Sequence, residues 1–165
     1  MASKTLDDLF YETLKDIYYA ERKISRTLPK MARGAQNEKL KQAFLEHKEE
    51  TDGQIERLQQ VFELIGKRAR GKTCDAIEGI ISEGEEILEE FKGTPALDAG
   101  LLAAAQAVEH YEISRYGTLC AWAKQLGMKE AADLLSQTLQ EESATDEKLS
   151  KLAESTLNAA AQKAA

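Results

Sequence analysis

Four long stretches of the sequence carry apolar residues at alternating spacings of three and four. In the first stretch the series begins with Leu6, Phe10 and Leu14. A period near 3.6 residues places such side chains on one face of an α-helix. The four stretches are residues 5–33, 37–65, 95–126 and 128–157. We therefore expect four amphipathic helices that bury their apolar faces against one another.

The connections between these stretches indicate how the helices are paired. The turns at residues 34–37 and at Gly127 are so short that they predict two antiparallel hairpins. Residues 67–94 hold a basic loop and a shorter helical pattern over about 75–92. We interpret this segment as a crossover that returns along the bundle, and we expect the second hairpin to begin at the same end as the first. A single crossover is the arrangement of ferritin-like bundles.

The predicted fold class is thus all-α, a ferritin-like four-helix bundle with a short extra helix in the crossover. One domain is expected over residues 1–157, followed by an Ala-rich tail, residues 158–165, that we expect to fray. Cys74 and Cys120 stand far apart and match no metal or redox spacing, which predicts two free thiols.

Charge and hydropathy exclude two classes of partner. The chain has 22 basic and 29 acidic residues, a net charge of −7, which argues against a general nucleic-acid binder because phosphate contacts need clustered Lys and Arg. No apolar run is long enough to cross a bilayer. We expect a cytoplasmic protein with no nucleic-acid or membrane partner.

Acidic and imidazole side chains interrupt each apolar stripe near its midpoint. The interrupting residues are Glu21, His47, Glu50, Glu109, Glu112, Glu142 and Asp146. In an antiparallel bundle of equal helices the midpoints meet at one height, so these side chains should converge. Burying a carboxylate without a partner costs several kcal/mol, and a shared site therefore needs a compensating charge. Two divalent metal ions would supply it, with iron as the first choice and manganese or zinc as alternatives.

Other interpretations of these residues remain open. Arg115 and Lys148 could neutralise the acids in an ordinary ion-pair network. His47 alone is compatible with a hydrogen-bonded core histidine. His110 should point about 100° away from Glu109, which favours a supporting or surface position. Whether the two histidines and Asp146 are metal ligands is undecided by spacing alone.

Five runs of the sequence carry a family resemblance that extends over nearly the whole chain. They are LKDIYYAE (14–21), HKEETDGQIERL (47–58), CDAIEGIISEGEEILEEF (74–91), AVEHYEISRYGTL (107–119) and TLQEESATDEKL (138–149). These runs closely resemble the YciE/YciF-like family of bacterial stress-associated proteins. The resemblance implies a ferritin-like bundle with an extra crossover helix, a homodimer and a rubrerythrin-like di-metal centre.

The resemblance also assigns roles to the glutamates. The pair Glu109-x-x-Glu112 is similar to the paired acids that rubrerythrins carry on their third helix. Glu21 matches the first-helix glutamate, Glu50 the bridging glutamate of the second helix, and Glu142 the fourth-helix glutamate. The sequence departs from the di-iron pattern in lacking the Glu-x-x-His pairs, which puts a standard ferroxidase centre in doubt.

Three functional hypotheses follow. The first is a di-iron or di-manganese protein that reacts with peroxide or oxygen; as an enzyme it would be a di-iron oxidoreductase with a small oxidant as substrate. The second is a non-enzymatic stress or scaffold protein with a metal-free polar core. The third is iron storage, which needs a hollow multi-subunit shell.

Overall fold

The computed structural model describes residues 4–163, and these residues form helices without any strand. The helices are α1 (Leu6–Gly34), α2 (Glu38–Leu64), α3 (Asp75–Glu90), α4 (Leu97–Gln125), α5 (Lys129–Leu152), the π-helical segment η1 (Ala153–Leu157) and α6 (Asn158–Gln162). The all-α prediction is confirmed. Each of the four long helices begins and ends within a few residues of its predicted limits, and none of the described helices is long and apolar enough to span a membrane.

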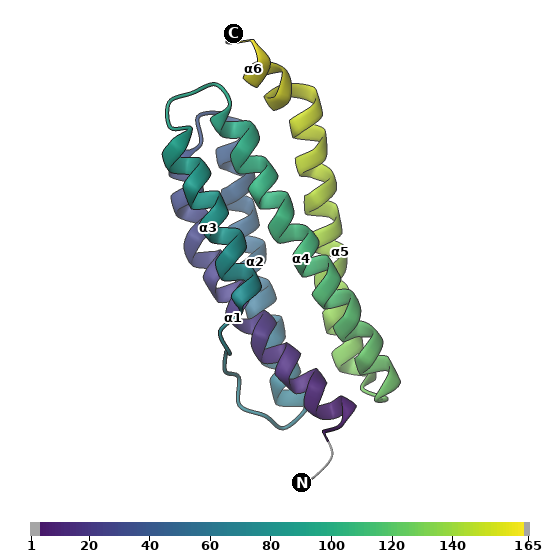
Figure 1. The fold of residues 1–165 in the computed structure, drawn as a ribbon. Helices are drawn as coiled ribbons and strands as arrows, with labels where there is room; N and C mark the ends of the chain where they lie inside the picture. The colour runs from purple at the N-terminus through teal and green to yellow at the C-terminus, as the bar shows by residue number, and fades with distance from the viewer. Residues whose placement is uncertain (1–3, 164–165) are drawn as a thin grey trace.

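The long helices form two hairpins, α1 with α2 and α4 with α5, while α3 packs along α1 and α4 (Figure 1). Short polar connections set these limits. Asn37 caps α2, because its side-chain oxygen accepts hydrogen bonds from the backbone N–H groups of Lys39 (2.9 Å) and Leu40 (3.3 Å). Gly66 and Gly127 follow the ends of α2 and α4 with φ angles of 67° and 73°, a left-handed conformation that glycine adopts without a steric penalty.

The second hairpin begins at the end of the bundle where α1 stops. Asp98, near the start of α4, accepts hydrogen bonds from the backbone N–H groups of Gln36 and Asn37, both at 2.8 Å. The prediction that both hairpins begin at the same end was therefore wrong. Helix α2 already brings the chain back to its starting end, and α3 then carries it to the opposite one (Figure 1).

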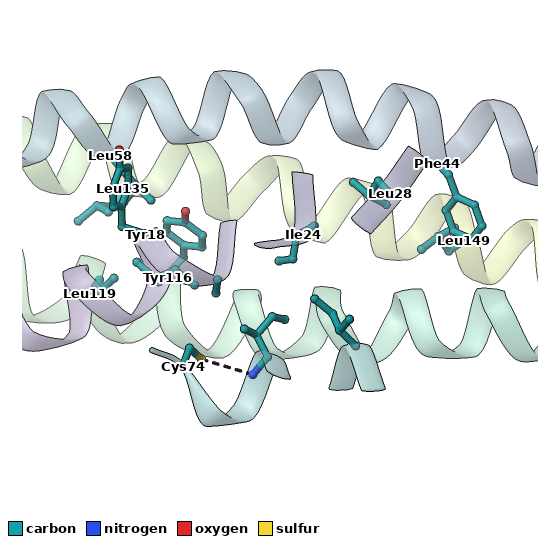
Figure 2. Close-up of a cluster of buried hydrophobic side chains, with 14 of the residues drawn as sticks. Tyr18, Ile24, Leu28, Phe44, Leu58, Cys74, Tyr116, Leu119, Leu135 and Leu149 are labelled. Carbon is teal, nitrogen blue, oxygen red and sulfur yellow. Dashed lines mark hydrogen bonds between the residues drawn. The ribbon is translucent and has the colours of Figure 1, made fainter. Parts of the chain in front are cut away.

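The buried hydrophobic side chains form one core that extends along the bundle axis. Figure 2 shows two groups of core side chains, with Ile24 between them. One group contains Leu58, Leu119, Leu135, Tyr18 and Tyr116, and the other contains Leu28, Phe44 and Leu149.

The C-terminal segment continues as helix beyond α5. Residues 158–162 form α6, and the predicted fraying of this tail stays a prediction. Leu157 anchors the end of η1 in the core, whereas the following alanines are largely exposed. Residues 1–3 and 164–165 of the predicted domain and tail lie outside the described residues. Cys74 and Cys120 are free, as predicted, and both are buried.

Candidate metal centre

Four buried side chains from three helices meet at the middle of the bundle. They are His47 on α2, Glu109 and Glu112 on α4, and Glu142 on α5. One potential ligand atom from each residue lies within 4.8 Å of those of the other three. Glu109 and Glu112 reach the same site because residues three apart share one face of a helix. All four side chains are buried, and the three glutamates are completely inaccessible.

Helix α1 contributes a fifth buried residue, Glu21, which is also completely inaccessible. The hydroxyl of Tyr116 donates a short hydrogen bond to Oε1 of Glu21, while Oε2 has no partner. Glu21 lies close enough to Glu112 for its negative charge to raise the pKa of that residue. All four long helices therefore direct a polar side chain to this level.

The most unusual property of the centre is a concentration of buried polar atoms without hydrogen bonds. Among residues 4–163 nine such side-chain atoms exist. Eight belong to the five residues of the centre: Oε2 of Glu21, Nε2 of His47 and both carboxylate oxygens of Glu109, Glu112 and Glu142. Each buried group left unsatisfied costs about 1–3 kcal/mol, so native proteins rarely gather them. Carboxylate oxygens and an imidazole nitrogen are the ligands of divalent cations, so the donor set fits a metal ion.

Burial favours the uncharged form of the glutamates in the centre. It is the main cause that raises the pKa of Glu21 to about 8, and the charge of Glu142 is the next. Burial likewise raises the pKa values of Glu109 and Glu112 well above the ordinary value for glutamate. Burial lowers the pKa of His47, which keeps the imidazole neutral and its lone pair available. Without a cation, these carboxyl groups therefore keep their protons to a higher pH than an exposed glutamate does, and a bound cation would displace the protons.

Basic side chains do not neutralise the centre. The guanidinium of Arg115 stacks over the ring of Tyr111 at 5.1 Å, and Lys148 pairs with Glu46. Within residues 4–163, no lysine or arginine forms an ion pair with the buried glutamates. The alternative of an ordinary ion-pair network with Arg115 and Lys148 is therefore contradicted.

Two residues proposed from the sequence lie outside the buried cluster. Glu50 is exposed and accepts a hydrogen bond from Oγ1 of Thr145 at 3.0 Å. The inward face of α2 passes from His47 through Thr51, which leaves Glu50 on the flank of the helix. Asp146 is half-buried, and its carboxylate lies 3.1 Å from Nε2 of His110, a histidine on the surface.

A polar network that the sequence did not indicate lies beside Glu142. Arg57 on α2 donates to both carboxylate oxygens of Glu141 on α5, at 3.0 and 2.8 Å, and to the hydroxyl of Thr138 at 2.6 Å. Gln54 also donates to Glu141, at 3.2 Å, while its own buried oxygen has no partner. This network fixes α5 against α2. The position of Gln54 on the apolar stripe of α2 was the one available signal.

Comparison with known proteins identifies the family. The family model described as "Domain of unknown function (DUF892)" matches residues 5–162. The chain belongs to the DUF892 family. Protein YciF from Escherichia coli (strain K12) is 49% identical to this DUF892 chain over 163 residues, which cover 98% of both proteins. The resemblance to YciE/YciF-like proteins is thereby confirmed.

Solved structures of similar proteins have the same fold as this DUF892 chain. The crystal structure of the E. coli stress protein YciF superposes with a TM-score of 0.90 and 50% identity, covering 94% of this chain and 99% of that one. The structure of YcfI from Rhodopseudomonas palustris gives a TM-score of 0.87 and 48% identity, covering 89% and 94% of the respective chains. The helical bundle is therefore shared across these relatives.

Proposed function

We propose that this DUF892 chain is a stress protein whose bundle core binds two divalent metal ions, with iron as the first choice and manganese or zinc as alternatives. The observation that carries the proposal is the set of eight buried atoms without hydrogen bonds at one level of the bundle. Every one of them can act as a ligand atom, and a pair of cations would satisfy them together.

Charge balance favours two ions over one. Four buried glutamates, Glu21, Glu109, Glu112 and Glu142, would carry four negative charges when ionised. Two divalent cations cancel that charge, whereas one leaves a net negative charge in a site that excludes water. Glu112 would help to hold both ions, because it is completely buried and lies close enough to Glu142, Glu21 and Glu109 for their charges to raise its pKa.

The remaining residues prepare the site for such ions. His47 offers a neutral nitrogen, since burial lowers its pKa. Tyr116 holds Oε1 of Glu21 through its hydroxyl and leaves Oε2 free to bind. Bound iron would supply redox chemistry toward peroxide or oxygen, which is the oxidant handling that we propose for this protein. We also propose a homodimer, following the family resemblance; light scattering tests it, and a dimer would exclude an iron-storage shell.

A second candidate is a non-enzymatic stress or scaffold protein with a metal-free polar core. The raised pKa values of Glu109 and Glu112 favour it, because protonated carboxyl groups can remain buried without a cation. This candidate predicts a melting temperature that is indifferent to metal ions and to chelators. The melting temperature, measured with metal ions and with chelator, therefore distinguishes the two proposals.

Metal content provides the test of the first proposal. Metal-free protein would be incubated with Fe(II) or Mn(II) without oxygen, desalted, and analysed for metal per chain. We expect about two ions per wild-type chain and loss of both in Glu112→Gln. Glu83→Gln on the exposed face of α3 is the matched control and should retain the wild-type content. Equal metal content in the two variants, or none in the wild type, would refute the proposal.

A further inference from the structure

A partly open apolar pocket of about 40 Å³, called the cavity below, lies between α1, α2, α3 and α4. Its walls are mainly hydrocarbon and include Ile24, Leu28 and Leu101. Two polar residues, Thr27 and His47, take part in the lining. Protein cores are normally packed at the density of organic crystals, so an unfilled space of this size is a distinct feature of the bundle.

Small residues create this space where the crossover helix packs against α4. Gly84 on α3 and Ala104 and Ala105 on α4 all contribute to the lining. A Cβ atom on Gly84 would lie 3.4 Å from Cβ of Ala104 and 3.6 Å from Cε of Met31, which shows how closely the helices approach here. Larger side chains at these positions would fill the cavity. The cavity therefore results from the small residues at these positions.

The cavity adjoins the candidate metal centre. His47 belongs to both, because its ring lines the cavity while its Nε2 atom lies 3.1 Å from Oε1 of Glu109. On α1, Ile24 follows Glu21 by one helical turn, and on α4, Ala105 precedes Glu109 by one turn. Figure 2 shows Ile24 between the two groups of core side chains.

The chemistry of the walls selects the occupant. The hydroxyl of Thr27 already donates to the backbone carbonyl of Lys23 at 2.9 Å, and Nε2 of His47 is directed to the carboxylate cluster. A buried water needs two to four polar partners, and peroxide has a similar need, so both are poorly matched to this space. A volume near 40 Å³ admits a molecule of two or three atoms and excludes an organic metabolite, whose pockets measure about 300–1,000 Å³.

We propose that this cavity binds dioxygen, or another uncharged apolar molecule of that size, and holds it beside the metal centre at His47. The use of the bound molecule at a metal ion rests on the proposed function. Binding itself depends on the cavity alone, because apolar cavities take up apolar gases without any metal. The apolar lining of the cavity favours oxygen over peroxide as the oxidant of this protein.

Xenon is the probe that tests binding, since it occupies dry apolar cavities and needs no metal. Crystals of the metal-free full-length chain would be pressurised with xenon and its anomalous signal measured. We expect a xenon peak among Ile24, Leu101 and Ala105 in the wild type and its loss in Ala105→Leu, which fills the cavity. Ala107→Leu, on the exposed face of the same helix, is the control and should keep the peak.

A wild-type cavity without xenon, or an unchanged peak in Ala105→Leu, would overturn the inference. Should Ala105→Leu fail to fold, Gly84→Ala replaces it, because its added methyl group also reduces the space; lower xenon occupancy supports the inference, and unchanged occupancy contradicts it. Metal content is measured on the same proteins. Xenon binding without metal binding would refute the proposed function alone, whereas metal without xenon would refute this inference alone.

Discussion

The Nε2 atom of His47 lies 3.1 Å from Oε1 of Glu109, and yet the two atoms form no hydrogen bond. Oε2 of Glu142 lies 3.8 Å from the same nitrogen and is also without a partner. Ligand atoms that each stand about 2.1 Å from a cation are separated by similar distances without bonding to one another. The relationship between His47 and Glu109 is therefore the contact expected of two ligands around a shared ion.

Metal should stabilise the folded protein. A ligand that binds only the native state at about 100 times its Kd adds about 2.7 kcal/mol, which corresponds to a rise in Tm of roughly 5–10 °C for a domain of this size. Thermal unfolding with Mn(II) and with chelator measures the shift. Glu112→Gln should abolish it, and Glu83→Gln should preserve it. A Tm that is the same with metal and with chelator favours the metal-free candidate instead.

The metal-free protein should lose stability as the pH rises from about 6.5 to about 8.5. The pKa of Glu21 is about 8 in the folded chain against 4.5 when unperturbed, so between these values the folded state binds more protons than the unfolded state. This contribution to stability is complete below pH 4.5 and is lost as the pH passes through about 8. Glu109 and Glu112 act in the same direction.

Urea denaturation across this pH range measures the loss. Only below pH 6.5 does the lowered pKa of His47 oppose the trend, because the unfolded imidazole then takes up a proton that the folded one refuses. Saturating Mn(II) should reverse the slope, since metal ligands must be deprotonated. An unfolding free energy that does not change with pH in the metal-free protein would show that the acids are less perturbed than their burial implies.

Tyr116→Phe should destabilise the chain by about 1–3 kcal/mol, because it removes the one hydrogen bond to Glu21 and leaves both of its buried oxygens without a partner. The matched control is Tyr18→Phe, whose hydroxyl accepts only from the exposed Gln59 at 3.2 Å and whose loss should cost less. Urea denaturation compares the two variants. Equal costs would argue that Tyr116 has no special role at Glu21.

Glu50→Gln and Asp146→Asn should retain the wild-type metal content. Both carboxylates lie outside the buried cluster, where Glu50 bonds to Thr145 and Asp146 contacts His110. Elemental analysis after desalting checks the expectation, with Glu112→Gln as the variant that loses metal. If Glu50→Gln loses metal as completely as Glu112→Gln does, the bridging role suggested by the sequence would regain support.

Asp98→Ala should destabilise the bundle by about 1–3 kcal/mol. The change removes the acceptor for the backbone N–H groups of Gln36 and Asn37 and so disconnects the start of α4 from the turn between α1 and α2. Asp133→Ala, which removes a surface pair with Lys129, is the control and should cost under about 1 kcal/mol. Chemical denaturation of both variants makes the comparison.

The helices and their pairing could be predicted from the sequence because the signals are local. Apolar spacing acts within a few residues, as do the cap at Asn37 and the glycines at 66 and 127 that the structure shows at the helix ends. The end of the bundle at which α4 begins was predicted wrongly. That feature depends on the path of the crossover, which the hydrogen bonds from the first turn to Asp98 fix over a long separation in sequence.

The height of the candidate site could also be predicted, since helix midpoints coincide in such a bundle. The residues that belong to the site could not all be identified from the sequence. Adjacent positions on a helix point about 100° apart, so a shift of one residue moves a side chain from the core to the surface. Glu50 beside Thr51 is the example: the buried residue is the threonine. The network of Arg57 and Glu141 beside Glu142 depends on contacts between helices, and Gln54 on the apolar stripe of α2 was its one signal in the sequence.

Anomalous diffraction from crystals grown with Mn(II) or Fe(II) tests the central claim most directly. Data collected above and below the absorption edge of the metal would locate every bound ion. The proposal predicts two peaks among Glu21, His47 and the three buried glutamates of α4 and α5, and their absence in Glu112→Gln. Crystals in which metal is bound only at the surface, for example at His110 and Asp146, would contradict the proposal.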